Sequence, residues 1–439
     1  MSNLSAALHK LALKLTISPE QIKIIAANFQ QAMENGLTGA SSSLKMLPSY
    51  LKKPSGKETG IYIALDFGGT NVRVLLTELL GEGQFILHAR AGSPLKHDVE
   101  QYNYISKQST ADQLFDFFAQ QIATLAKPGK TYSLGHTFSF PIHQMSLNAG
   151  TLIHWTKEIE TTGMADKDIT TLLKAALTRQ GLDYVVPQVI LNDTVGTLLA
   201  SAYKNPFTDI GSICGTGHNT AYIQPNTPWT KGPMIINMES GNFDQLPFTI
   251  YDTLLDKQSE KPGKQRLEKM VSGHYIGELV RIIACSVLAE GLLTNSATAS
   301  KILAVPYILN GAHISLLQED NSRDGQAIAH FLANQLGILH STCEDRQALK
   351  EIAKFVSTRS ARLVAATYIA VLHHIDPGLT QNHIIAVDGS LYEKLPGYAD
   401  TIQMTLDQGL DTACEIRTVL TKDGSGIGAA IAAAIAVTN

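Results

Sequence analysis

Three glycine-rich segments and one short polar segment carry residue types that bind phosphate or move protons. Residues 66–73 read DFGGTNVR and lie between two apolar runs. Glycines let a backbone approach a phosphate closely, and the amides and the Thr70 hydroxyl can bond its oxygens. Asp66 can face a metal ion, and Arg73 can neutralise phosphate charge. A plain tight hairpin is the alternative, and from the glycines alone it is the preferred one.

The second and third glycine segments are weaker signals. Gly215 to Gly217 separates two strand-like runs, and residues 423–428 (DGSGIG) open the last apolar helix. Amides at a helix N-terminus can hold a phosphate or a ribose. An N-cap with glycine-assisted helix packing also explains 423–428, and without context it is favoured. No GxxxxGK[ST] loop and no GxGxxG following a strand occurs in the sequence.

The short polar segment is Asn192-Asp193-Thr194, between a buried apolar run and a helical pattern. A carboxylate at that place is either an N-cap or a catalytic group at the carboxyl end of a sheet, and the cap is favoured without context. Glu239 and Glu268 have no special spacing, so surface charge is their simplest explanation. The histidines lack ligand spacing such as HExxH, which argues against a protein-bound metal site.

The elements that position these residues alternate between strand and helix periods. The apolar patterns predict these strands and helices: strands at 61–65, 72–79, 85–91, 133–140, 185–191, 210–214, 220–223, 383–387 and 415–420, and helices at 3–15, 19–35, 111–125, 168–179, 194–203, 265–290, 324–340, 345–374, 398–408 and 427–437. A strand–glycine turn–strand unit followed by helices occurs twice. This recurrence predicts an α/β protein whose two similar sheets face each other across a cleft.

Length and composition agree with a large globular protein. The chain has 439 residues, enough for two or three domains. Its net charge is −4, from 35 Lys+Arg and 39 Asp+Glu, with 17% charged and 44% hydrophobic residues. This composition argues against a disordered chain and gives no electrostatic footprint for nucleic acid. Four scattered cysteines, no secretory signal and no run long enough to span a bilayer predict a cytoplasmic protein that does not enter a membrane.

The order of the motifs carries a family resemblance. Residues 134–141 (LGHTFSFP) and 150–157 (GTLIHWTK) closely resemble the sugar-binding signature of hexokinases. The family's other motifs have counterparts in the same order at 46–50, 65–76, 191–198, 388–392 and 424–426. The resemblance implies an ATP-dependent hexose kinase with an α/β, actin-like ATPase (ribonuclease H-like) bilobal fold, in which two mixed sheets flanked by helices surround a hinged cleft. It also implies a smaller domain of 60–193 plus helix 426–439, and a larger domain of 1–59 and 194–425.

The same resemblance implies roles for individual residues. Asp193 would be the general base that accepts the proton of the 6-hydroxyl of a hexose, with glucose the expected sugar, and Lys157 would lie near the reacting groups. The residues implied to bind the sugar are Ser139, Phe140, Thr156, Lys157, Asn192, Asp193, Asn219, Glu239, Gln265 and Glu268. The residues implied to hold ATP are Asp66, Gly68, Gly69, Thr70, Asn71, Arg73, Gly215, Thr216, Thr358, Gly389, Ser390, Gly424 and Ser425. Mg²⁺ would lie near Asp66 and Asp193 through ATP and water, because it sheds its hydration reluctantly.

Departures from the family pattern leave alternatives open. The family has Gly-Phe after the lysine, where this chain has Glu158-Ile159, and a Phe where it has His136. The added charge motivates a second hypothesis, a non-catalytic sugar sensor on the same scaffold. A chaperone or filament ATPase is a third, against which the sugar signature argues. The expected partners are a hexose and Mg-ATP, without nucleic acid, and the chain is expected to be a monomer or homodimer.

Overall fold

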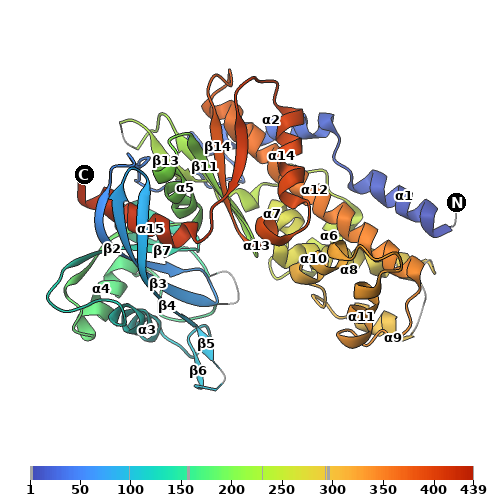
Figure 1. Cartoon of the computed structure of the whole chain (residues 1–439), viewed down its shortest axis with the longest axis horizontal. Helices are drawn as coiled ribbons and strands as arrows, with labels where there is room; N and C mark the ends of the chain where they lie inside the picture. The colour runs from blue at the N-terminus through green and yellow to red at the C-terminus, as the bar shows by residue number, and fades with distance from the viewer. Residues whose placement is uncertain are drawn as a thin grey trace.

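The computed structural model describes residues 3–97, 99–155, 159–229, 231–291, 293 and 297–438 (Figure 1). The helices are α1 (Asn3–Leu15), α2 (Pro19–Leu37), α3 (Ala111–Ala123), α4 (Ile169–Arg179), α5 (Asp193–Lys204), α6 (Ile250–Gln258), α7 (Arg266–Val271), α8 (Gly273–Ala289), α9 (Ala297–Leu303), α10 (Gly311–Glu319), α11 (Gln326–Asn334), α12 (Cys343–Ile375), α13 (Ser390–Lys394), α14 (Tyr398–Gly409) and α15 (Gly424–Thr438). The strands are β1 (Leu47–Pro48), β2 (Thr59–Phe67), β3 (Asn71–Gly81), β4 (Gln84–Pro94), β5 (Lys96–His97), β6 (Tyr102–Asn103), β7 (Tyr132–Phe138), β8 (Ile142–Ser146), β9 (Ala149–Leu152), β10 (Val185–Leu191), β11 (Thr208–Cys214), β12 (His218–Gln224), β13 (Met234–Asn237), β14 (His383–Asp388) and β15 (Ile416–Leu420).

Two mixed sheets form the centre of the molecule. One has the order β10-β7-β2-β3-β4, and the other has the order β1-β13-β12-β11-β14-β15. In each sheet an antiparallel pair joined by a glycine turn, β2–β3 or β11–β12, is extended by parallel strands, β7 or β14. The predicted fold class is therefore confirmed. Figure 1 shows α3 and α4 beside the first sheet, and the long α12 with the other helices beside the second.

Helices α5 and α15 lie between the two sheets. Their apolar side chains form one buried cluster with residues of β2 and of the β12–β13 pair, including Ala64, Ala221 and Ile235. This cluster is distinct from the core of the first sheet and from the larger core around α8 and α12. The N-termini of α5 and α15 carry Asp193 and Ser425, so the inter-sheet packing also positions two of the predicted site residues.

Most predicted elements occur, with end shifts of a few residues. The helix predicted at 265–290 is wrong as a single element, because Ser272 has an extended backbone (φ −90°, ψ 155°) between α7 and α8. The amide of Gly273 donates instead to the carbonyl of Gly215 (2.8 Å). A tertiary contact to a glycine turn has thus overridden a continuous helical pattern. Within the described ranges, no helix is long and apolar enough to cross a membrane.

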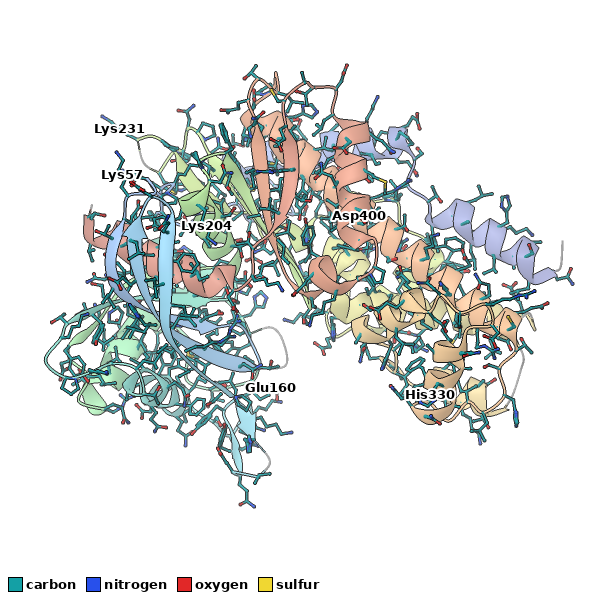
Figure 2. The ribbon with its side chains drawn as sticks, viewed as in Figure 1. Lys57, Glu160, Lys204, Lys231, His330 and Asp400 are labelled. Atoms are coloured by element: carbon teal, nitrogen blue, oxygen red, sulfur yellow. The ribbon has the colours of Figure 1, made fainter. Side chains whose placement is uncertain are left out.

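Figure 2 places six labelled side chains on the two parts of the molecule. Lys57, Lys204 and Lys231 lie at the end where α5 terminates, and His330 and Asp400 lie on the helical part. The Tyr203 hydroxyl donates to the carbonyl of Glu58 (2.8 Å), which ties the end of α5 to the segment that leads into β2.

One buried histidine joins two strands of the second sheet, β11 and β14, to the C-terminal end of α12. His383 Nδ1 donates to Asp209 Oδ2 (2.8 Å), and His383 Nε2 donates to Asp376 Oδ2 (3.2 Å). Lys53 also pairs with Asp209 (2.8 Å). Burial lowers the pKa of His383, but the hydrogen bonds and charges of the two carboxylates outweigh it and raise the pKa above its usual value.

This arrangement predicts a pH-dependent stability. Because the pKa of His383 is higher in the folded than in the unfolded chain, its contribution is complete below the unfolded pKa of about 6.5 and is lost as pH rises through the folded pKa. We expect the free energy of unfolding of the native protein to fall more between about pH 6 and about pH 9 than that of a His383→Asn variant. Urea titrations of both proteins at the two pH values measure this, and equal pH dependences would contradict it.

Candidate active site

The first glycine turn, Gly68 to Thr70, joins β2 to β3 and is solvent-exposed at Gly68 and Thr70. The carboxylate of Asp66, at the end of β2, is buried; it pairs with Arg73 and accepts a hydrogen bond from the Ser425 hydroxyl (2.9 Å). Burial raises the pKa of Asp66, against the lowering effects of Arg73 and Ser425. Asp66 therefore anchors Arg73 and α15 beside the turn.

Carboxylates from three elements converge behind this turn. Arg73 also pairs with Asp423 (2.7 Å), and the amide of Gly424 donates to Asp388 Oδ2 (3.1 Å). Burial raises the pKa of Asp388 to about 6, although the Gly389 and Gly424 amides lower it. The ends of β2 and β14 and the start of α15 thus meet next to a cavity of about 570 Å³ lined by Gly68, Thr70, Asn71, Val72, Arg73, Arg90, Ala91, Gly92, Ser93 and Pro94.

The second glycine turn, Gly215 to Gly217, joins β11 to β12 in the other sheet. Gly215 packs directly against Gly389, at the start of α13. The amide of His274 donates to the carbonyl of Thr216 (3.1 Å), next to the Gly273–Gly215 bond. The structure therefore brings the second glycine turn next to Gly389 and Ser390, four residues that the resemblance implies for ATP binding.

A polar network, Asn192, Asn219, Asn237 and Glu239, connects α5 to the second sheet. The Asn219 side-chain amide donates to Asn192 Oδ1 (3.3 Å) and to Asn237 Oδ1 (2.8 Å). The Asn237 amide in turn donates to Glu239 Oε1 (3.0 Å). The network presents amide and carboxylate groups, which match the donors and acceptors of a hydroxyl-rich ligand.

Glu268 lies beside this network. Its Oε2 accepts from the backbone amide of His218 (3.0 Å), the neighbour of Asn219, and its Oε1 accepts from the Gln265 side chain (2.9 Å). Gln265 and Glu239 both have left-handed backbones, with φ of 52° and 54°. Such conformations cost energy in non-glycine residues and are held at sites where the side-chain direction matters. Glu239, Gln265 and Glu268 are thus fixed components of one polar site.

Asp193 is the first residue of α5 and follows the N-cap residue. Asn192 is the N-cap of α5, since its Oδ1 accepts from the amide of Thr194 (3.0 Å). Asp193 is the first helical residue and is half-buried, with Oδ1 accepting from the same amide (2.8 Å). Its charge contributes to the raised pKa of Asp66. Asp193 therefore follows a member of the polar network, and its charge acts on Asp66 beside the first glycine turn.

Three predicted residues have different surroundings. Ser139 follows β7, and its amide donates to the carbonyl of Phe67 (3.1 Å), next to the first turn. The Phe140 ring is buried in an aromatic cluster, 4.9 Å from the Phe67 ring, so this ring does not line a polar site. Thr358 lines a separate cavity of about 300 Å³ with Pro396 and Gly397. Thr156, Lys157 and Glu158 lie outside the described residues.

Asn237 is a member of the network that the sequence analysis missed. It lies in β13 two residues before Glu239, at the end of the apolar run 234–236. Glu239 lies beyond the end of β13 and has a left-handed backbone, so strand alternation gave no signal for this pair. Asp388 and Asp423, which hold the start of α15 and Arg73, were missed as well.

The fold and the matching family models together identify the family of this chain. Two sheets, each with a glycine turn, and the helices α5 and α15 packed between them have the architecture of the actin-like ATPase fold. Two family models described as hexokinase match residues 7–203 and 209–435. The chain belongs to the hexokinase family.

Individual relatives agree over nearly the whole chain. Hexokinase-2 of Oryza sativa subsp. japonica is 35% identical over 98% of this chain and 91% of its own length. Hexokinase-1 of Saccharomyces cerevisiae is 33% identical over the same shares of the two chains. Among solved structures, a hexokinase from Schistosoma mansoni complexed with glucose has a TM-score of 0.86 and 30% identity, and covers 98% of both chains. Another hexokinase crystal structure also has a TM-score of 0.86 and 30% identity, and covers 99% of this chain and 100% of its own.

Proposed function

We propose that this protein transfers the terminal phosphoryl group of ATP to the 6-hydroxyl of a hexose, with glucose the expected sugar, producing hexose 6-phosphate and ADP. One observation carries the proposal: Asp193 follows Asn192 of the polar network, which suits a sugar, and its charge acts on Asp66 beside the first glycine turn, which suits a phosphate. The relatives named hexokinase, and the one complexed with glucose, support the same reaction.

The reaction needs positioning and charge neutralisation more than covalent chemistry from the protein. Asn219, Glu239 and Glu268 hold the sugar hydroxyls. The Asp193 carboxylate accepts the proton of the hexose 6-hydroxyl while the oxygen of that hydroxyl attacks the terminal phosphorus of ATP. Arg73 and the amides of the two glycine turns neutralise the phosphates.

The carboxylate oxygens of Asp66 and Asp193 are the type of ligand that Mg²⁺ prefers. Within the described residues no group of three or more His, Cys, Asp or Glu side chains is arranged to hold a metal. Mg²⁺ needs few protein ligands when phosphate and water supply the others. Asp193 and Asp66 would hold Mg-ATP through water, and the ion would draw charge from the transferring phosphoryl group.

The wider setting is part of the proposal. The smaller domain comprises 60–193 and 426–439, and the larger comprises 1–59 and 194–425. The protein acts in the cytoplasm, in glycolysis, as a monomer or homodimer. Closure of the two domains around a sugar excludes water and spares ATP from hydrolysis.

A screen for sugar-dependent ADP release tests the function. Purified protein with Mg-ATP is offered glucose, mannose, fructose or glucosamine, and a coupled assay follows ADP. We expect ADP release to require a hexose. Sugar binding without ADP release would instead support the sensor hypothesis. ADP release without sugar, coupled to polymerisation, would support a filament ATPase.

Removing Asn237 tests the polar network. An Asn237→Ala variant removes the 2.8 Å acceptor of the Asn219 amide and the donor to Glu239 Oε1, and losing such hydrogen bonds costs about 1–3 kcal/mol in a buried site. We expect the KM for the hexose to rise about tenfold or more, with the KM for ATP changed much less. Steady-state kinetics with each substrate varied separately measures this, and equal effects on the two KM values would argue against a sugar-specific role.

A further inference from the structure

Arg90 is a cation beside the first glycine turn that has no role in the mechanism above. It lies in β4, the edge strand of the first sheet, and lines the cavity of about 570 Å³ together with Gly68, Thr70 and Arg73. Its side chain is 48% exposed, compared with 35% for Arg73. The cavity therefore has two guanidinium groups on its wall.

The strand register places both arginines on one face of the sheet. Arg73 pairs across β3–β4 with Gly92, and Leu75 pairs with Arg90. Paired residues point to the same side, and so do residues two apart along a strand. Leu75 packs in the cluster with α15, so this face is the one toward Asp423 and the start of α15.

Asp423 holds both guanidinium groups. Its Oδ1 accepts from Arg73 (2.7 Å) and its Oδ2 from Arg90 (3.2 Å). Arg73 is engaged a second time, by Asp66. The bond to Asp423 uses one of the several N–H donors of Arg90, and the half-exposed group keeps the others for a ligand. Asp423 thus orients the Arg90 guanidinium and leaves most of its N–H donors available to a ligand.

The negative charge beside the first glycine turn favours a second cation there. Three carboxylates, Asp66, Asp388 and Asp423, lie near the first glycine turn, and the mechanism above gives phosphate binding there to one cation, Arg73. A polyphosphate brings several further negative charges. Guanidinium groups bind phosphate oxygens through paired N–H donors and stay charged at all relevant pH values.

We propose that Arg90 is a second phosphate-binding residue, whose guanidinium contacts the phosphate oxygens of the nucleotide while Asp423 holds it in place. This proposal rests on the proposed function, since it assumes that the cavity beside the first glycine turn receives nucleotide phosphates.

The test separates nucleotide affinity from turnover. For Arg90→Ala we expect the KM for Mg-ATP and the Kd for ATP to rise about tenfold, as for loss of one charge-assisted contact, with the hexose KM and kcat changed less than about threefold. Arg90→Lys should recover part of the affinity, because it keeps the charge but not the paired donors. Arg179→Ala, which removes an arginine paired with Asp116 on α3, is the matched control and should leave both constants unchanged. An unchanged ATP affinity in Arg90→Ala would overturn the proposal.

A double-mutant cycle excludes an indirect effect through Asp423. If Arg90 acts only by neutralising Asp423, then Arg90→Ala should have no effect in an Asp423→Asn background. Direct contact predicts that the loss of ATP affinity persists in that background, and its disappearance would overturn the proposal.

Measuring the Kd for ATP separates the proposal for Arg90 from the proposed hexose kinase function. If the native protein bound ATP but phosphorylated no hexose, the proposed function would fail and the Arg90 variants would still be decided by their Kd values. If the native protein bound no ATP, both would fail.

Discussion

An Asp193→Asn variant is expected to lose about 100- to 10,000-fold in kcat, the usual contribution of a general base. Asparagine has nearly the shape of aspartate but cannot accept the 6-hydroxyl proton. The start of α5 should survive, because its N-cap is Asn192 and the Thr194 amide keeps an acceptor at position 193. Hexose binding should therefore remain measurable while turnover is lost.

The measurement combines steady-state kinetics with hexose binding by calorimetry. Asp183→Asn is the matched control, since Asp183 is an exposed aspartate that accepts from Thr178 (2.6 Å) near the end of α4. The control should keep native kcat. An Asp193→Asn variant with kcat within threefold of the native value would remove Asp193 from the role of base. A variant that failed to bind sugar as well would point to a structural role.

A Gly428→Ala variant is expected to destabilise the protein strongly. A Cβ at Gly428 would lie 2.0 Å from the carbonyl oxygen of Gly196 and 2.4 Å from its carbon. These atoms belong to the backbone of α5, so α5 and α15 would have to separate. Overpacking of this kind costs about 1–3 kcal/mol or more, which exceeds the gain of about 1 kcal/mol from replacing glycine by alanine in a helix.

The separation should also impair catalysis. Ser425 donates to Asp66 from the first turn of α15, and a displaced helix would move Ser425 away from the Asp66–Arg73 pair. We expect a net loss of about 2 kcal/mol in the free energy of unfolding, together with a lower kcat. Val437→Ala, at the exposed end of the same helix, should stay within about 0.5 kcal/mol of the native protein. Chemical denaturation measures both variants, and a Gly428→Ala variant at least as stable as the native protein would contradict the packing account.

Local patterns in the sequence predicted the elements that have strong periods. Strand 185–191 and helix 3–15 have the predicted bounds, although Pro187 and Gln188 interrupt the apolar run of the strand. The break at Ser272 was not predictable from the pattern, since its cause is a hydrogen bond to Gly215 more than fifty residues away. Short elements such as α6 and α10 were also missed.

The site was predicted from the motifs, not from the residues that connect them. Asn192, Asn219, Glu239 and Glu268 were named from the family resemblance; the structure connects the first three in one network with Asn237, and Glu268 lies beside them at the His218 amide. Asp423 was treated as part of a glycine segment, and its role in orienting Arg73 and Arg90 depends on a contact between α15 and the first sheet. Side-chain contacts between a sheet and a helix distant in the sequence produce no periodic pattern of residues that could predict them.

Identification of the product tests the central claim most directly. Native protein, Mg-ATP and glucose are incubated together, and the products are resolved by phosphorus NMR. The proposed function predicts glucose 6-phosphate and ADP in equal amounts, and no ATP consumption when glucose is omitted. ATP consumption that yields inorganic phosphate in place of the sugar phosphate, or glucose binding with no ATP consumption, would contradict it.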